Sequence, residues 1–243
     1  MTIPFGLLIL SAYLLGAVPS AYLVAKWSRG IDLRQYGSGN VGLSNLLRSN
    51  FRWLIIPVIL FDLGKGMIII WVAQLLGLGY AQQVTIGVAA IMGHNWPVFL
   101  RFSGGRGILT TLGVIIILPS INGMVPWGAI ISLIITAIGA FVVHNIPLGV
   151  IIAVAVVPLV SWGFTEPLPL TLGFLAIFLI TIIRRLTVPR AAIAASVSQR
   201  ELFINRLLFD RDIRDKTAWI HRLPPEASST QQPLEQKKRE GKG

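Results

Sequence analysis

Long apolar runs constrain this chain more than any other feature of its sequence. About 20 apolar residues in a helix cross a bilayer, and the chain repeats runs near that length. We place seven of them, at 3–25, 53–76, 82–100, 108–121, 124–143, 146–162 and 167–184. The fourth run is short and meets Pro119, so six spans is the alternative. The sequence therefore predicts an all-α, polytopic transmembrane helical bundle.

Basic residues are confined to alternate connections between these runs. Charged residues make up 13% of the chain, against about 25% in soluble domains, so their placement is informative. The first connection holds Lys26, Arg29, Arg34, Arg48 and Arg52, and the third holds Arg101 and Arg106. The second and fourth connections carry no charge. The positive-inside rule then predicts an external N-terminus and a cytoplasmic C-terminus.

Composition excludes several kinds of chemistry. The chain has no cysteine, which removes disulfides, thioester intermediates and thiolate metal sites. Its three histidines lie in unrelated settings, so we expect no metal centre. The net charge of +11 suits anionic lipid headgroups or phosphorylated substrates, and no nucleic-acid-binding module accompanies it.

Two polar, glycine-rich segments lie between the apolar runs, GSGNVGLSNLLR at 37–48 and SGGRG at 103–107. Small residues let backbone N–H groups approach an anion, and Arg48 and Arg106 can bind it bidentately. One such segment alone is better explained as a tight loop whose arginine obeys the positive-inside rule. Two of them on one membrane face favour a phosphate site.

Ionisable residues inside the apolar runs add to this hypothesis. Asp62 and Lys65 are three positions apart, and hence on one helical face. Each charge near the bilayer centre costs about 2.5–3.5 kcal/mol, so both should face the bundle interior. A self-neutralising ion pair and an anion site are equally good interpretations of Asp62, whereas Lys65 favours a ligand. His94, just before the second glycine segment, fits a structural role more readily than a catalytic one.

Familiar catalytic and nucleotide-binding motifs do not fit. Gly37, Gly39 and Gly42 match a dinucleotide fingerprint in spacing, but no βαβ unit surrounds them. No Walker sequence and no nucleophile elbow is present. The histidine followed five positions later by aspartate, which acyl-CoA-dependent glycerolipid acyltransferases use, is missing at all three histidines.

Four segments in order, at 13–20, 31–48, 62–66 and 93–107, resemble the signatures of the bacterial acyl-phosphate:glycerol-3-phosphate acyltransferases of the PlsY type. The resemblance covers roughly the first half of the chain. It implies a seven-helix integral enzyme of the cell inner membrane that needs no cofactor. Such an enzyme transfers a fatty acyl group from acyl phosphate in the bilayer to cytoplasmic glycerol 3-phosphate, forming lysophosphatidic acid and inorganic phosphate.

The resemblance also implies roles for individual residues. Ser38 and Arg48 would hold substrate phosphate, in a loop that Gly37, Gly39, Asn40 and Asn45 shape. Gly104, Gly105 and Arg106 would form the second phosphate-binding loop, and Lys65 and His94 would line the pocket. No dedicated protein base is expected, because substrate phosphate helps to deprotonate the attacking hydroxyl.

The chain departs from this family pattern at two places. The family usually has lysine where Arg106 stands, and arginine changes the reach and geometry of the charge. After the last span the family has His-x-x-Asn and then Gly-Thr-Glu, whereas this chain has Arg185 and Val188 in the nearest register and lacks Gly-Thr-Glu. A divergent acyltransferase with another phosphorylated acceptor is therefore one alternative. A non-catalytic transporter or binding protein for an organic phosphate is another.

The C-terminal part has a different composition from the rest. We divide the chain into a transmembrane acyltransferase domain at 1–189 and a cytoplasmic tail at 190–243. Apolar residues at near-helical spacing predict an interfacial amphipathic helix in the tail: Ile193, Val197, Ile204, Leu207 and Leu208. From Pro224 onward there is too little apolar surface to fold, and we expect disorder.

Overall fold

The structure is a computed structural model that describes residues 5–47 and 52–222. All regular secondary structure in these residues is helical, which confirms the prediction of an all-α bundle. The seven predicted runs correspond, in order, to α1 (Phe5–Ala17) with α2 (Ser20–Arg29), α4 (Ile55–Leu75), α5 (Tyr80–Asn95), α6 (Ile108–Ile121), α7 (Trp127–Phe141), α8 (Ile146–Gly163) and α9 (Leu168–Leu186).

Not all of these helices are long enough to cross a bilayer by themselves. Among the described residues, four stretches combine sufficient length and hydropathy: Phe5–Ser28, Ile55–Leu75, Ile146–Gly163 and Leu168–Leu186. Helices α6 and α7 are apolar but shorter. The number of spans and the sidedness of the termini therefore remain predictions.

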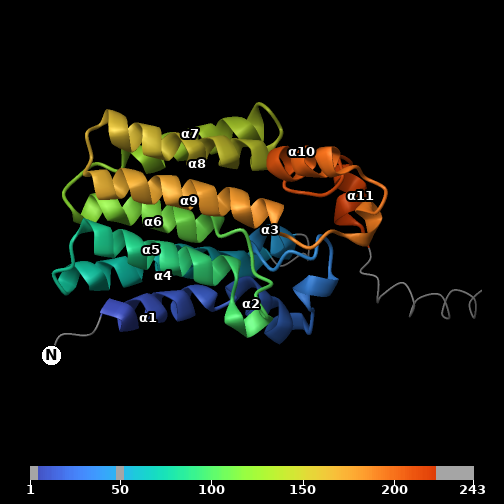
Figure 1. Cartoon of the computed structure of the whole chain (residues 1–243). Coiled ribbons are helices and arrows are strands. Elements are labelled where there is room, and N and C mark those ends of the chain that lie inside the picture. Colours follow the sequence, from blue (N-terminus) through green and yellow to red (C-terminus); the bar gives the residue numbers. More distant parts are fainter. Residues whose placement is uncertain (1–4, 48–51, 223–243) are drawn as a thin grey trace, which may run out of the picture.

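The long helices lie side by side, and the short elements gather at one end of them (Figure 1). This end, the loop end, carries α2, α3 (Leu43–Leu46), α10 (Gln199–Phe209) and α11 (Lys216–Ile220). The 3-10 helices are η1 (Leu33–Gln35), η3 (Arg52–Leu54), η4 (Val98–Leu100) and η5 (Ala192–Ala194). The first glycine-rich segment follows α2, and the second connects the end of α5 to the start of α6. Both segments therefore lie at the loop end.

A tight crossing of α1 and α5 fixes the geometry of this end. A Cβ atom on Gly16 would lie 2.1 Å from the carbonyl oxygen of Ala90, and one on Gly93 would lie 2.1 Å from that of Tyr13. Small residues permit such backbone contact between membrane helices. The crossing brings the end of α1 against the end of α5, where His94 lies.

Apolar side chains fill the bundle and also cover its outside. The main core joins α1 and α4 to α9, with fully buried members such as Ile70, Ile86, Leu118 and Leu170. Large apolar side chains on α7 and α8 are exposed, including Phe141 at 81% and Leu159 at 70%. An outer surface of this kind fits contact with lipid rather than with water.

The structure divides the first predicted run, 3–25, into two helices. Helix α1 ends at Ala17 and α2 begins at Ser20, with Pro19 between them. Proline has no backbone N–H and cannot continue the helical hydrogen-bond ladder. The break leaves the Val18 carbonyl available, and Lys65 Nζ donates to it at 3.3 Å.

The prediction of one amphipathic helix in the tail is wrong. Ile193 lies in η5, Val197 lies in the bend that follows, and the other three lie in α10. Ile193 and Ile204 are exposed. Helix α10 instead packs on α8 and α9, and its buried residues are Leu202, Asn205 and Arg206. The segment after Pro224 lies outside the described residues.

Candidate active site

A buried cluster of ionisable groups occupies the interior of the loop end. Lys65 Nζ lies 2.9 Å from Asp62 Oδ1 and 2.9 Å from His94 Nδ1. The lysine side chain is fully buried, and Ser20 Oγ donates to Asp62 Oδ1 at 2.8 Å. With the Val18 carbonyl, Lys65 has three acceptors for its three N–H groups. The predicted placement of Asp62 and Lys65 on one inward helical face is confirmed.

The hydrogen bond from Lys65 determines how His94 can act. An ammonium group only donates, so Nδ1 of His94 must accept, and the proton of the neutral ring is assigned to Nε2. Nε2 points toward the second glycine segment, since a Cβ on Gly105 would lie 2.4 Å from it. His94 therefore presents an N–H donor on the side opposite Lys65.

The first glycine-rich loop is shaped by one buried amide. Asn45 Oδ1 accepts the Ser38 N–H at 3.0 Å, and Asn45 Nδ2 donates to the carbonyls of Leu33 and Tyr36 at 3.1 and 2.8 Å. Gly37 and Gly39 have φ of +57° and +67°, a conformation that favours glycine. A side chain on Gly37 would also meet Asn45 Oδ1 at 2.5 Å. The loop's fold thus depends on glycine and asparagine at these places.

An exposed ion pair stands beside this loop. Arg34 donates to Asp32 through Nε and Nη2, the latter at 2.6 Å. These hydrogen bonds hold the pKa of Asp32 below its usual value. Asp32 therefore remains an anion that neutralises Arg34, and this arginine is not a spare charge for a ligand.

The second glycine-rich loop is held from behind by Arg184 of α9. Its Nε donates to the Gly105 carbonyl at 2.9 Å and its Nη2 to the Gly104 carbonyl at 2.6 Å. On the loop itself, the Gly105 N–H donates to the His94 carbonyl at 3.2 Å. The Gly105 carbonyl and the Arg106 N–H belong to the same trans peptide group and point in opposite directions. Since the carbonyl points at Arg184, the Arg106 N–H points away from Arg184.

Arg106 itself extends toward the C-terminal segment. Its Nε lies 2.8 Å from Asp210 Oδ1 and donates to Asp210 Oδ2 at 2.9 Å. Its Nη1 donates to the Arg184 carbonyl at 3.4 Å. Both side chains are mostly buried, at 16% and 20% exposure. Arg106 is thus held at the rim of the second loop.

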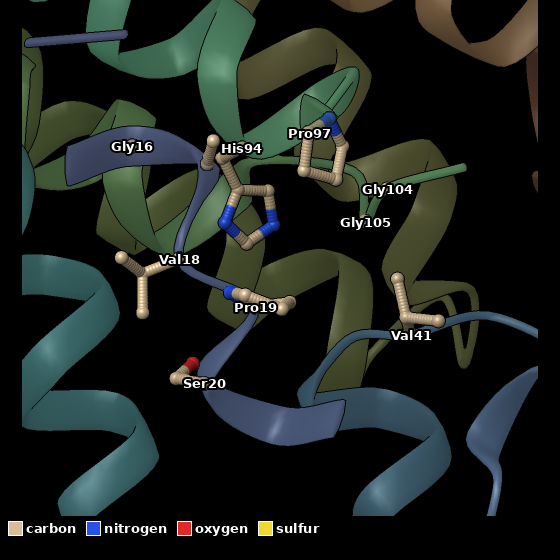
Figure 2. Close-up of a pocket in the computed structure, with 10 residues that line it drawn as sticks. Gly16, Val18, Pro19, Ser20, Val41, His94, Pro97, Gly104 and Gly105 are labelled. Atoms are coloured by element: carbon tan, nitrogen blue, oxygen red, sulfur yellow. The ribbon is translucent and has the colours of Figure 1, made fainter. Parts of the chain in front are cut away.

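A pocket opens between these parts (Figure 2). His94 extends into it from the end of α5, with Pro19 and Ser20 on one side and Gly104 and Gly105 on another. Its empty space of about 210 Å³ includes part of the open solvent at its mouth. A long acyl chain is larger than this space and must extend elsewhere.

The charges around this pocket favour an anion. Lys65 and Asp62 balance one another, as do Arg106 and Asp210. The salt bridges of the described residues give Arg184 no carboxylate partner. Its positive charge lies against the carbonyl side of the loop, so the environment of the pocket is net cationic.

The predicted site residues take up different places around this pocket. His94, Gly104 and Gly105 line it, and Val41 of the first loop lies beside them. Lys65 lies behind His94, and Asn45 lies within the first loop. Among the remaining predicted residues, Ser38 is buried, Asn40 is half-buried and Arg48 lies outside the described residues.

Sequence reasoning missed Arg184 and Asp210. Arg184 stands at the end of the last apolar run, where the positive-inside rule accounts for a basic residue without any role in a site. Asp210 lies in the segment where a lipid-associated helix was expected. The available signal for Arg184 is that two arginines, at 184 and 185, follow an apolar run directly. No local pattern marks Asp210.

Comparison with known proteins gives a consistent match over most of the chain. The sequence model of the glycerol-3-phosphate acyltransferase family matches residues 6–193. Glycerol-3-phosphate acyltransferase 5 of Dehalococcoides mccartyi is 42% identical over 228 residues, covering 91% of this chain and 95% of the relative. Glycerol-3-phosphate acyltransferase 4 of another strain is 45% identical over 224 residues, with 90% and 94% covered. These alignments exceed residues 6–193 in extent and therefore include part of the C-terminal segment.

Solved structures agree with the sequence relatives. The crystal structure of PlsY, an integral membrane glycerol 3-phosphate acyltransferase, in its glycerol 3-phosphate form has a TM-score of 0.69 at 30% identity. That match covers 88% of this chain and 96% of PlsY. The lysophosphatidic acid form of PlsY gives 0.67 at 27% identity. The chain belongs to the glycerol-3-phosphate acyltransferase family.

Proposed function

We propose that this protein transfers a fatty acyl group from acyl phosphate to glycerol 3-phosphate, producing lysophosphatidic acid and inorganic phosphate for phospholipid synthesis. The observation that carries the proposal is the pocket between the two glycine-rich loops, with the N–H of His94 Nε2 facing Gly105. It is a small, cationic site at one end of an apolar bundle. Family membership supports the reaction class.

In this proposal the pocket acts mainly by orienting and neutralising phosphate groups. The N–H of His94 donates to a phosphoryl oxygen, and the backbone of the second loop approaches it closely because Gly104 and Gly105 have no side chains. Ser38 and Arg48 are proposed to hold phosphate at the first loop, and Arg106 at the second. Lys65 acts through His94 by fixing its protonation.

The chemical step then needs little further help from the protein. The glycerol hydroxyl oxygen bonds to the acyl carbon, the bond from that carbon to the phosphate oxygen breaks, and the hydroxyl proton passes to phosphate. His94 is poorly arranged to be a base, since Nδ1 accepts from Lys65 and Nε2 carries the proton. A mixed anhydride is already activated, so positioning and charge neutralisation can supply most of the rate enhancement.

We propose that the site faces the cytoplasm of a bacterial inner membrane. The basic residues of the first and third connections support this orientation through the positive-inside rule. Acyl phosphate is proposed to enter from the bilayer and glycerol 3-phosphate from the water. The apolar helix surfaces beside the site are suited to the acyl chain, which the small pocket cannot hold.

The experiment is an assay of the pure protein in sealed, inside-out vesicles. With acyl phosphate and glycerol 3-phosphate outside, we expect equal amounts of lysophosphatidic acid and inorganic phosphate, undiminished by a chelator. Right-side-out vesicles should be inactive until they are permeabilised. Equal or better use of acyl-CoA would contradict the donor, and uptake of glycerol 3-phosphate without acylation would favour a transporter.

A further inference from the structure

The C-terminal segment contacts both phosphate loops. We call residues 199–222, which include α10 and α11, the C-terminal cap. At its centre the Asp210 carboxylate binds Arg106 of the second loop, 104 positions earlier in the sequence. At its end Arg222 donates a hydrogen bond to the Ser38 carbonyl of the first loop. The cap begins after residue 193, where the family match ends.

Buried ionic contacts fix the cap to the end of α9. Arg206 donates to Asp212 Oδ1 at 2.7 Å and to the Leu186 carbonyl at 2.6 Å. Arg185 donates from α9 to the Leu207 carbonyl at 2.6 Å. These groups are mostly buried, so their hydrogen bonds gain strength from exclusion of water. The cap is thereby held as a rigid support rather than as a loose tail.

Asp210 occupies a backbone position that aims its side chain at the second loop. It ends α10 in the left-handed conformation, with φ of 54° and ψ of 40°, and its N–H donates to the Arg206 carbonyl at 3.1 Å. Aspartate and asparagine tolerate this conformation better than most other residues do. Asparagine can therefore replace Asp210 without disturbing the backbone.

The contact with Asp210 uses only one part of the Arg106 guanidinium. Nε is taken by the carboxylate and Nη1 makes a long bond to the Arg184 carbonyl. The structure gives Nη2 of Arg106 no hydrogen-bond partner within 5–47 and 52–222. Because a guanidinium is a planar fork with five N–H donors, Nε can be held by one anion while Nη2 donates to another.

Asp210 also offsets a repulsion between cations. Arg106 lies next to Arg184, whose guanidinium is committed to the carbonyls of Gly104 and Gly105. Without the carboxylate, Arg106 would be driven away from Arg184 and from the loop. The carboxylate thus keeps the charged Arg106 side chain at the second loop, next to Gly105, which lines the pocket.

We infer that Asp210 is a positioning residue for the acyl transfer: the cap holds Arg106 through Nε and leaves the N–H groups of Nη2 for substrate phosphate. This inference rests on the proposed role of Arg106 in phosphate binding. It gives the cap a function in the reaction, in place of a solvated or lipid-associated tail.

The test is a double-mutant cycle on kcat/KM for glycerol 3-phosphate, with thermal unfolding measured for every variant. We expect Asp210→Asn to lower kcat/KM about tenfold, as for loss of one charged hydrogen bond. A lysine has one nitrogen in place of the separated donors of the fork, so the carboxylate and the phosphate would compete for the same ammonium group. In an Arg106→Lys background, Asp210→Asn should therefore change kcat/KM less than twofold. A loss of the same size in both backgrounds would contradict positioning through Arg106.

Asp215→Asn is the matched control within the cap. Asp215 caps α11 by accepting from the N–H groups of Thr217 and Ala218, and asparagine caps helices equally well. This variant makes the same charge change and should keep full activity. An Asp210→Asn variant as active as this control, or more active than wild type, would overturn the inference. Arg106→Ala separates the two proposals, since wild-type activity there would remove Arg106 from the phosphate site itself.

Discussion

The two ends of the bundle both bury polar side chains, but of different kinds. At the end opposite the site, Gln83 Nε2 donates to Gln74 Oε1 at 2.5 Å and Asn122 Nδ2 donates to Gln83 Oε1 at 2.8 Å. At the loop end, the corresponding contacts join Lys65 to Asp62 and His94. The first group is neutral and the second is ionic.

The difference separates a structural network from a functional one. The amides donate to one another and to the carbonyls of Leu78 and Leu118, which stabilises the ends of three helices. The ionic group is well bonded on the Lys65 side, but its His94 also faces a pocket. A buried ion pair is weak evidence for stability, because hydrophobic replacements are often neutral or stabilising. We infer that the ionic group is retained for its chemistry.

Replacing the ion pair should produce the largest effect on activity. In the double variant Asp62→Asn, Lys65→Met, no charge is left without a partner, and His94 loses the donor that fixes its ring. We expect kcat/KM to fall about 100-fold, comparable to loss of one preorganised donor. The thermal unfolding midpoint should stay at or above the wild-type value. Activity within twofold of wild type would show that the pair is structural.

Replacing the central amide should have the opposite outcome. Gln83→Leu removes the donor to Gln74 Oε1 and the acceptor of one Asn122 N–H, and we expect a loss of about 1–3 kcal/mol in stability. Activity per folded molecule should remain within twofold, because this cluster is at the far end of α5 from His94. Thr85→Ala, on the exposed side of the same helix, serves as the control and should change neither quantity. A large fall in kcat/KM for Gln83→Leu would remove the distinction between the two ends.

Much of the fold can be predicted from the sequence, because each long apolar run predicts one of the long helices. The pairing of Asp62 with Lys65 was also predictable, since it depends only on helical spacing. The break at Pro19 was not predicted, although proline before a new helix is a local signal. Hydropathy alone does not distinguish one long apolar helix from two shorter helices that follow one another directly.

The remaining site contacts depend on how distant segments pack. Lys65 reaches His94 only because α4 and α5 lie together, and Arg184 reaches the second loop from 79 residues further along. In the sequence, Arg184 looks like an ordinary topology-setting basic residue, and nothing near Lys65 indicates that it bonds to His94. Asp210 was hidden for another reason, because its neighbours Leu207 and Leu208 suggested a lipid-facing helix. In the structure α10 packs on α8 and α9.

The central claim is that phosphate binds in the pocket beside His94, and a binding measurement tests it without relying on turnover. The measurement is the rise in unfolding midpoint caused by glycerol 3-phosphate, in wild type and in Gly105→Ala. A Cβ at this position would lie 2.4 Å from His94 Nε2 and would fill the proposed anion position. Gly163→Ala is the matched control, since a Cβ there meets nothing within 4 Å.

A ligand that binds only the folded protein stabilises it, and above Kd the stabilisation grows with the logarithm of the ligand concentration. We predict this rise for wild type and Gly163→Ala, and no rise for Gly105→Ala at the same concentrations. The same rise in all three proteins would contradict the account and place the phosphate elsewhere.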